Sequence, residues 1–251
     1  MQVIDPDKAA RPLFVLSERH AATDGPWHSH RRAQFIHASE GVLTVRTETG
    51  LWVVPPQRAV WILPGLRHRV SATREFRLRT LYADAAALPV PDRCCVVVVD
   101  PLLDALLQEA SAFGADYPVE GPEARIMRVI VDRLSQRREV KSALPLPRDP
   151  RLQRMARHLE KHPDDPRPLE ALAAAFGMSG RTAARRCLAD TGLRFGQWRQ
   201  QLRLLKALEA LSRGDGVAQA AHDVGYADTS SFITVFKAAF GDTPARHFRR
   251  D

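Results

Sequence analysis

The sequence predicts an α+β multidomain protein, with a β-rich N-terminal half and an all-helical C-terminal half. The chain has 251 residues, which is long for one average domain and short for three, so we expect two compact domains. Up to about residue 90, short apolar runs alternate with turn signals, whereas apolar residues recur at helical spacing from Asp100 onward. A proline-rich stretch at 143–150 interrupts the helical pattern, and only helical segments follow it.

The strands are expected within residues 1–99. Residues 42–47 alternate in polarity, Thr49-Gly50 marks a turn, and the runs 51–54 and 59–63 follow. Short β-rich runs with turn signals about every 8–12 residues are typical of a sandwich or barrel. We therefore predict a β-barrel over 1–99. Its core is expected to contain Trp27, Phe35, Trp52 and Trp61.

Two helices are expected in the segment 100–142, over about 101–110 and 123–138, and Pro101 suits a first helical turn. Their apolar stripes exceed what a small barrel needs, which favours a dimer interface. Packing of the same stripes on their own barrel is an equal alternative. The residues of this predicted interface are Leu103, Leu106, Leu107, Ile126, Ile130 and Leu134.

The stretch 143–150 holds three prolines, cannot continue a helix and is predicted to be a linker. Residues 1–150 contain 20 Lys+Arg against 18 Asp+Glu, whereas residues 151–251 contain 17 against 11. Of the formal net charge of +8, the helical domain 151–251 therefore carries +6. A surplus placed in this way favours a polyanionic partner such as DNA.

Composition excludes several classes of protein. Apolar residues make up 45% and charged residues 26%, which is ordinary globular usage. The first residues lack the apolar core of a signal peptide, and the longest apolar run, 94–99, is far shorter than the roughly 20 residues that span a bilayer. Three cysteines, two of them adjacent, make a poor disulfide framework. We expect a cytoplasmic protein without a membrane partner.

The helical half contains an internal repeat. Each copy places an alanine four residues before a glycine, at Ala173 and Gly177 and again at Ala221 and Gly225. A small residue lets a second helix cross closely, and the glycine ends the first helix in a left-handed conformation. A second helix follows each copy, after the predicted N-caps Ser179 and Asp228. Two helix-turn-helix motifs, joined by an amphipathic helix at about 195–212, are therefore predicted.

Further segments extend this pattern: Ser179-Gly180-Arg181-Thr182, Thr191-Gly192-Leu193, Arg203-Leu204-Leu205, Ser231-Phe232 and Phe240-Gly241-Asp242-Thr243-Pro244. Together with the repeat, they make residues 165–250 resemble the DNA-binding domain of AraC/XylS-family transcription regulators. Two positions depart from the family, which usually has a large apolar residue at Ala183 and an aromatic at Cys187. Both positions are expected to face the core.

The resemblance implies that the two recognition helices enter successive major grooves on one face of double-stranded promoter DNA. The residues implied to face DNA are Arg181, Thr182, Ala184 and Arg185 in the first helix, and Thr229, Ser230, Ser231, Ile233 and Thr234 in the second. Arg181 or Arg185 can bond guanine O6 and N7 together, and Ile233 can contact a thymine methyl. Lys237 and Arg246 would meet phosphates. The alternative is that the arginines form a solvated face.

A group of histidines marks the β half. His28-Ser29-His30 is followed by Gln34 and Gly41 in the spacing H-x-H-x3-Q-x6-G, and His68 lies further on. In a strand, His28 and His30 point to the same face, where Gln34 and His68 can join them from neighbouring strands. Three imidazoles and an amide oxygen can hold a divalent transition metal. His37 is out of phase and is expected on the opposite face.

These histidine segments resemble cupin motifs, with Gln34 where glutamate is common. Residues 15–90 thus resemble a cupin barrel, the sensor half of one branch of the regulator family, which implies an N-terminal cupin-like β-barrel followed by two helices. Sensor cupins commonly lack metal. The alternative to a metal site is therefore that His28, His30 and His68 hydrogen-bond in the barrel mouth or contact an effector.

We therefore expect a sequence-specific DNA-binding transcription regulator whose barrel senses a small-molecule effector and which needs no catalysis. Its expected partners are promoter DNA and the effector, and the interpretation allows a homodimer and contact with RNA polymerase. Two alternatives remain. One is a metal-dependent cupin enzyme fused to a helical domain, and the other is a DNA-binding protein whose barrel only dimerises it.

Overall fold

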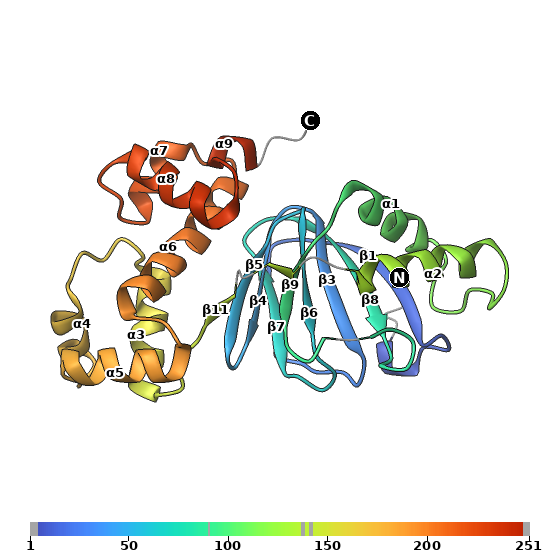
Figure 1. Ribbon diagram of the computed structural model, residues 1–251, viewed down its shortest axis with the longest axis horizontal. Coiled ribbons are helices and arrows are strands. Elements are labelled where there is room, and N and C mark those ends of the chain that lie inside the picture. Colours follow the sequence, from blue (N-terminus) through green and yellow to red (C-terminus); the bar gives the residue numbers. More distant parts are fainter. Residues whose placement is uncertain (1–4, 90, 137–138, 141–142, 248–251) are drawn as a thin grey trace. The chain divides into compact units, whose positions relative to one another are not determined.

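The computed structural model describes residues 5–89, 91–136, 139–140 and 143–247. The chain divides into two compact units (Figure 1). The first comprises Met1–Glu48 with Trp52–Ala143, and the second comprises Thr49–Leu51 with Leu144–Asp251. The first unit contains two α-helices and nearly all of the strands. The other described α-helices belong to the second unit, together with the short strand pair at 50–51 and 144–145.

The strands of the N-terminal half pair antiparallel in two sheets. One sheet has the order β1-β8-β3-β6-β9-β10, and the other has the order β11-β5-β4-β7-β2. The strand bounds are β1 Leu13–His20, β2 Thr23–Asp24, β3 Ala33–Glu40, β4 Leu43–Thr47, β5 Gly50–Val54, β6 Arg58–Ile62, β7 His68–Ala72, β8 Phe76–Ala83, β9 Cys95–Val98, β10 Glu139–Val140 and β11 Leu144–Pro145. A 3-10 helix at Pro6–Lys8 precedes them. The predicted β-rich first half with two following helices is confirmed.

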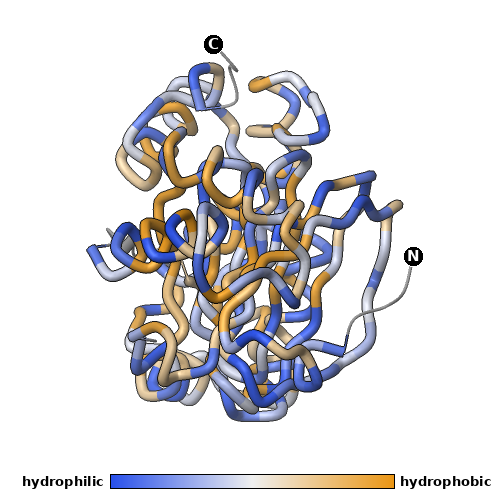
Figure 2. Tube along the Cα trace, turned by 90° about the vertical axis from the view of Figure 1, so that its right-hand side faces the viewer, coloured by the Kyte–Doolittle hydropathy of each residue, from blue (hydrophilic) through white to orange (hydrophobic). Residues whose placement is uncertain are grey.

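Consecutive strand residues feed two separate apolar clusters. In β3, Phe35 joins one cluster and Ile36 the other, and in β6 Trp61 and Ile62 divide in the same way. Side chains alternate between the faces of a strand, so the first sheet is apolar on both faces. One face shares its cluster with β4 and β5 of the second sheet, and the other shares its cluster with the two helices. Figure 2 shows the hydropathy along the chain, with hydrophobic residues in orange.

The helices α1 (Pro101–Ala110) and α2 (Pro122–Ser135) cover the outer face of the first sheet (Figure 1). Asp100 caps α1 by accepting the Leu103 N–H, and Pro101 occupies the first turn as predicted. Of the residues predicted to form a dimer interface, Leu103, Leu107, Ile130 and Leu134 are buried in the cluster, and Leu106 and Ile126 pack against it. The alternative, packing on their own barrel, is therefore what the structure has. The stripes are wide because the sheet beneath them is apolar.

A polar group fastens α1 to the same sheet. His37 of β3 is fully buried, and its Nε2 lies 3.0 Å from Oδ1 of Asp104 on α1. The other ring nitrogen, Nδ1, lies 3.0 Å from the carbonyl oxygen of Arg58. Arg79 of β8 also bonds the Asp104 carboxylate. His37 thus lies on the face of β3 away from the other histidines, as predicted.

The second unit is helical, as predicted. Its helices are α3 Pro150–Lys161, α4 Leu169–Ala175, α5 Gly180–Thr191, α6 Phe195–Ser212, α7 Val217–Asp223, α8 Thr229–Phe240 and α9 Pro244–His247. The joining helix α6 has the predicted bounds and buries Trp198, Leu202, Leu205, Leu208 and Leu211. In the described part of the chain, no helix is both long enough and apolar enough to cross a membrane.

The structure orders much of the predicted linker. Leu144–Pro145 forms β11, which pairs with β5 at the edge of the second sheet, and Leu146 N–H donates to the Thr49 carbonyl. Pro150 is already the first residue of α3, because Asp149 caps that helix and proline suits its first position. Edge strands tolerate proline, which explains how β11 forms in so proline-rich a stretch.

Candidate functional sites

The two helix-turn-helix motifs turn with the same backbone geometry. Gly177 has φ +73° and Gly225 has φ +81°, the left-handed conformation predicted for both. In each motif, the N–H after the glycine donates to the carbonyl of the alanine four residues before the glycine. The bonds are Met178 to Ala173 at 2.9 Å and Tyr226 to Ala221 at 3.0 Å. The sequence repeat is therefore a structural repeat.

The first recognition helix, α5, separates its three arginines by face. Ser179 caps the helix by accepting the Thr182 N–H at 3.2 Å, as predicted. Arg181 and Arg185 are exposed, but Arg186 is half-buried and forms an ion pair with Asp149 at the start of α3. Two cations are thus available to a ligand, and the third holds α5 against α3.

The opposite face of α5 is buried. Ala183 is fully buried and Cys187 keeps 4% exposure, so both family departures face the core as expected. The exposed face holds one residue that the sequence analysis missed, Leu188, with 49% of its surface exposed. It follows Arg181 by seven positions and Arg185 by three, so helical periodicity alone could have placed it beside them.

The second recognition helix, α8, has a hydroxyl-rich first turn. Asp228 caps it by accepting the N–H groups of Ser230 and Ser231, as predicted, and also accepts the Ser231 hydroxyl at 2.8 Å. Thr234 Oγ1 donates to the Ser230 carbonyl at 3.0 Å. The hydroxyls of Ser231 and Thr234 therefore donate their hydrogen bonds within the helix, and their remaining lone pairs can accept hydrogen bonds from a ligand.

The residues predicted to face DNA all lie in the described part of the second unit, and each is exposed or half-buried. Exposed are Arg181, Ala184, Arg185, Ser230, Ser231, Thr234, Lys237 and Arg246. Half-buried are Thr182, Thr229 and Ile233. Their accessibility is compatible with contact to a large ligand.

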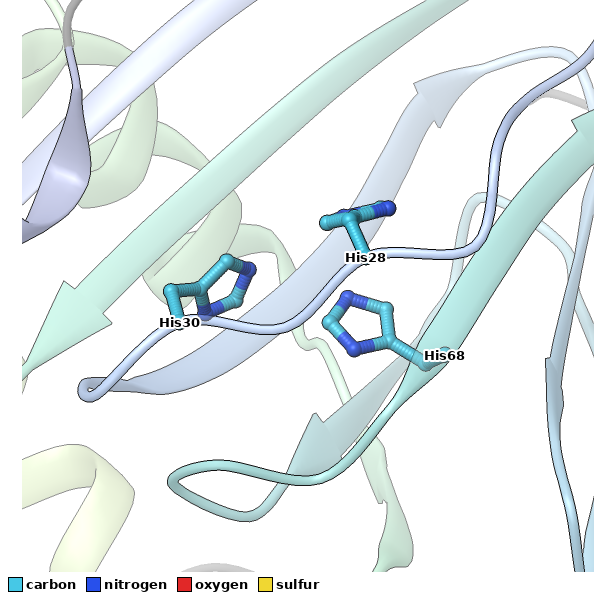
Figure 3. Close-up of side chains that lie close together, drawn as sticks. All are labelled: His28, His30 and His68. Atoms are coloured by element: carbon cyan, nitrogen blue, oxygen red, sulfur yellow. The ribbon is translucent and has the colours of Figure 1, made fainter.

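In the first unit, the structure brings the three predicted histidines together (Figure 3). His28 and His30 lie on an irregular segment rather than in a continuous strand, and His28 forms an isolated bridge with His68 at the start of β7. Ring centroids are 4.3 Å apart for His28 and His68, 5.0 Å for His30 and His68, and 5.6 Å for His28 and His30. One ligand nitrogen from each lies within 4.8 Å of the others.

Backbone carbonyls select the same tautomer in all three rings. His28 Nδ1 lies 3.0 Å from the Pro26 oxygen, His30 Nδ1 3.3 Å from the Arg32 oxygen, and His68 Nδ1 2.9 Å from the Leu66 oxygen. A carbonyl only accepts, so each Nδ1 carries the proton and each neutral ring keeps its lone pair on Nε2. Burial lowers the pKa of His68 to about 4 and also lowers that of His30, so both are neutral at pH 7. The cluster therefore offers acceptors.

Gln34 plays a different part from the one predicted. Its Oε1 lies 2.9 Å from His68 Nε2, and its Nε2 lies 3.2 Å from the hydroxyl of Tyr82 on β8. Because the proton of His68 is on Nδ1, its Nε2 cannot donate to this oxygen, and we assign the amide the orientation turned by 180°, in which its N–H donates to His68 and its oxygen accepts from Tyr82. Gln34 thus occupies one of the three lone pairs instead of adding a fourth ligand.

Two further groups border the cluster. Tyr82 stands edge-on to His30, with ring centroids 5.2 Å apart, and strand pairing places it opposite Gln34. Trp27 is half-buried rather than in the core, and the guanidinium groups of Arg67 and Arg69 lie 5.6 and 5.8 Å from its ring centre. The segment around Trp27 has no strand periodicity, so nothing in the sequence placed its ring at the surface. Phe35, Trp52 and Trp61 are buried as predicted.

Comparison with known families matches both halves. A helix-turn-helix domain model covers residues 172–250, and a model of the AraC-like ligand binding domain covers residues 11–110. The first match includes both repeats, and the second includes the histidine cluster. The two sites therefore lie in modules of different types.

Comparison with individual proteins gives a full-length relative. The chain is 38% identical over 234 residues to the HTH-type transcriptional regulator NimR of Escherichia coli, covering 92% of this chain and 86% of that protein. It is 36% identical over 92 residues to the regulator RipA of Corynebacterium diphtheriae, covering 37% of this chain and 28% of that protein. ToxT from Vibrio cholerae, solved with an unsaturated fatty acid, aligns with 96% of each chain, a TM-score of 0.40 and 10% identity.

Proposed function

Since the chain belongs to the AraC family of HTH-type transcriptional regulators, we propose that α5 and α8 read promoter DNA in successive major grooves and that the histidine cluster receives the signal. As a member of this family, the chain is a DNA-binding regulator with a ligand-binding domain. Its relatives are regulators and not enzymes, so the enzyme alternative is set aside. DNA binding also supports a cytoplasmic location.

The observation that carries the DNA proposal is the separation of cations on α5. Arg181 and Arg185 are exposed, whereas Arg186 pairs with Asp149. A guanidinium can bond guanine O6 and N7 together, which is worth about 1–3 kcal/mol of discrimination. On α8, the hydroxyls and Ile233 would contact bases or thymine methyl groups, and Lys237 and Arg246 would contact phosphates.

Arg185→Ala tests this reading, with Arg157→Ala as a matched control that removes an exposed cation from α3. Titration by gel shift at fixed salt should show about tenfold or greater loss for Arg185→Ala on specific DNA. Arg157→Ala should change affinity less and equally for all sequences. Equal affinity of the wild type and Arg185→Ala for the specific site would contradict the assignment.

For the barrel, we propose that His28, His30 and His68 hold a divalent transition metal. The donor set fits, because a backbone oxygen fixes each Nδ1–H as in known metal sites and leaves Nε2 as the ligand atom of each ring. At His68 the ion would replace the Gln34 amide as the partner of Nε2. His30 Nε2 is buried near the Gln34 amide without a hydrogen bond of standard geometry. A bound ion would supply a positive centre that an effector's oxygen or nitrogen can contact.

Titration calorimetry of the full chain with Co²⁺ or Zn²⁺ tests the metal. We expect one ion per chain, loss of binding in His30→Ala, and unchanged binding in His222→Ala, whose imidazole is exposed on α7. Absence of heat at millimolar metal would leave the cluster as a direct effector site. A thermal-shift screen with small aromatic and heterocyclic compounds tests that alternative, since a ligand of the native state raises its melting temperature.

A homodimer through α1 and α2 is also proposed, on different residues from those first predicted. Leu102 and Val129 retain 53% and 43% exposure on these helices. Sedimentation of the full chain should show a dimer that Leu102→Glu with Val129→Glu dissociates, and a wild-type monomer at micromolar concentration would refute it. Contact with RNA polymerase is proposed from the family alone.

A further inference from the structure

We infer that Arg203, on α6, sets the separation of the two recognition helices and thereby the operator spacing that the chain accepts. The inference rests on the proposed entry of α5 and α8 into successive major grooves. The helix α6 follows the first helix-turn-helix motif and precedes the second, so a side chain that ties α6 to both can fix their relation.

The guanidinium of Arg203 donates to backbone oxygens on two sides. Its Nε donates to the Pro163 oxygen at 2.8 Å, and its Nη2 lies 3.5 Å from the Asp165 oxygen. Both belong to the loop between α3 and α4, in the first half of the unit. Its Nη1 donates to the oxygen of Gly225 at 3.3 Å, in the turn of the second motif.

The turn of the second motif approaches the first half directly at this point. A Cβ on Gly225 would lie 2.7 Å from Nη2 of Arg203 and 2.9 Å from Cα of Asp164. The residue at 225 must therefore be glycine for contact as well as for its positive φ. The approach leaves the turn little freedom to shift relative to the loop.

The first motif provides an internal comparison. Arg151 of α3 donates to the oxygen of Gly177, the equivalent turn, at 3.0 Å. Nothing lies within 4 Å of a Cβ on Gly177, and both partners belong to the first half. Arg151 therefore braces one motif, whereas Arg203 joins two.

Operator spacing is sensitive to such a joint. Successive major grooves are about 34 Å or 10–10.5 base pairs apart, so one base pair changes the spacing by about 3.4 Å and the facing direction by about 35°. A rigid pair of recognition helices therefore loses affinity for a duplex with altered spacing, whereas a pair that can move relative to each other adapts to it. Lysine keeps the charge of Arg203 but lacks the planar fork that reaches three oxygens.

The experiment uses the full chain and a duplex that the wild type selects from a randomised DNA pool. Variants of this duplex carry one base pair more or fewer between the two segments that α5 and α8 are proposed to contact. Fluorescence anisotropy at fixed salt compares the wild type, Arg203→Lys and the control Arg151→Lys. We expect the wild type and Arg151→Lys to lose about tenfold or more on altered spacing, and Arg203→Lys to lose about threefold or less while binding the selected duplex more weakly.

Several results would overturn the inference. An unchanged spacing penalty in Arg203→Lys, or an equal loss on every duplex, would reduce the residue to general support of the fold. Helical circular dichroism checks folding, and Arg203→Gln serves as a second variant. Loss of the helical signal in both would assign Arg203 to folding and refute the role in spacing. Failure of the wild type to select any duplex would instead refute the proposed DNA reading itself.

Discussion

Replacing Asp104 with alanine removes the carboxylate that joins α1 to the first sheet. Two partners lose it: the fully buried ring of His37, whose Nε2 lies 3.0 Å away, and the guanidinium of Arg79, which is 5% exposed. The hydrogen bond from His37, together with the Arg79 charge, holds the pKa of Asp104 below its usual range although partial burial opposes this. The carboxylate is therefore bound as an anion.

The expected loss can be worked from these contacts. A hydrogen bond to a charged group contributes about 1.5–3 kcal/mol, and two are lost. The side chain of Asp104 is 43% exposed, so solvent screening argues for the lower end of this range. In the variant, Arg79 also retains its hydrogen bond to the backbone oxygen of residue 104, which is 3.3 Å long in the wild type. We expect the local stability of α1 on the sheet to fall by about 2–3 kcal/mol.

Hydrogen exchange followed by mass spectrometry measures this locally, which matters because a chain with two units need not unfold in one step. Protection of peptides from α1, β3 and β8 should fall about 30-fold to 150-fold. Asp132→Ala removes an exposed carboxylate from α2 and should change protection little. A loss below threefold in Asp104→Ala would refute the role given to the cluster.

The dependence on pH follows from the direction of the shift. A carboxyl whose pKa is lower in the folded state stabilises the fold above its unfolded pKa, near 3.9, and this stabilisation is lost as pH falls through the folded value. The difference between wild type and Asp104→Ala should therefore be constant near neutral pH and close below about pH 4. A gap that does not narrow at all as the pH falls below the unfolded pKa would contradict the electrostatic origin.

Two further predictions concern the histidine cluster and the first motif. Gln34→Glu replaces a neutral partner of His68 with an anionic ligand and should raise Co²⁺ affinity about tenfold by calorimetry. Gln34→Ala should give a smaller gain, because it frees the His68 lone pair, and no gain in either variant would contradict the proposed ion. Gly192→Ala tests backbone strain alone, because Gly192 has φ +72° and no atom lies within 4 Å of an added Cβ. The free energy of unfolding in urea should fall by about 1 kcal/mol. A change near zero would mean that the end of α5 relaxes.

The helical half was largely predictable because its signals are local. Ser179 and Asp228 cap their helices through contacts within three residues. Gly177 and Gly225 adopt the left-handed conformation that was predicted from their position at the end of the first helix of each motif. None of these features needs a distant partner. The same reasoning predicted the bounds of α6, whose apolar stripe repeats at helical spacing.

The partners of apolar surfaces were not predictable in this way. The stripes on α1 and α2 could cover either a second copy or their own sheet, since periodicity gives a face and not its partner. The helices pack on their own sheet because the first sheet is apolar on both faces, with Phe35 and Ile36 buried in clusters on opposite sides of it. Only the pairing of β3 between β8 and β6 shows this.

The histidine cluster shows where sequence spacing stops being informative. Spacing brought His28, His30 and His68 into one prediction, and the structure gathers them. Their shared tautomer depends on carbonyls in the segments around Pro26, Arg32 and Leu66, which have no periodic pattern. The chemistry of the cluster as an acceptor therefore required coordinates, and so did the bond that gives one lone pair to Gln34.

Charge is the feature for which the structure changes the conclusion most. The helical half carries a net +6, but many of its cations already have partners within the unit. Arg167, Arg186, Lys206 and Arg213 form ion pairs, and Arg151, Arg199 and Arg203 bond backbone oxygens. Each phosphate neutralised contributes about 0.9 to the slope of log affinity against log salt. The salt dependence of DNA binding should therefore reflect a few exposed cations, among them Arg181, Arg185 and Lys237, and stay well below what 17 basic residues would suggest.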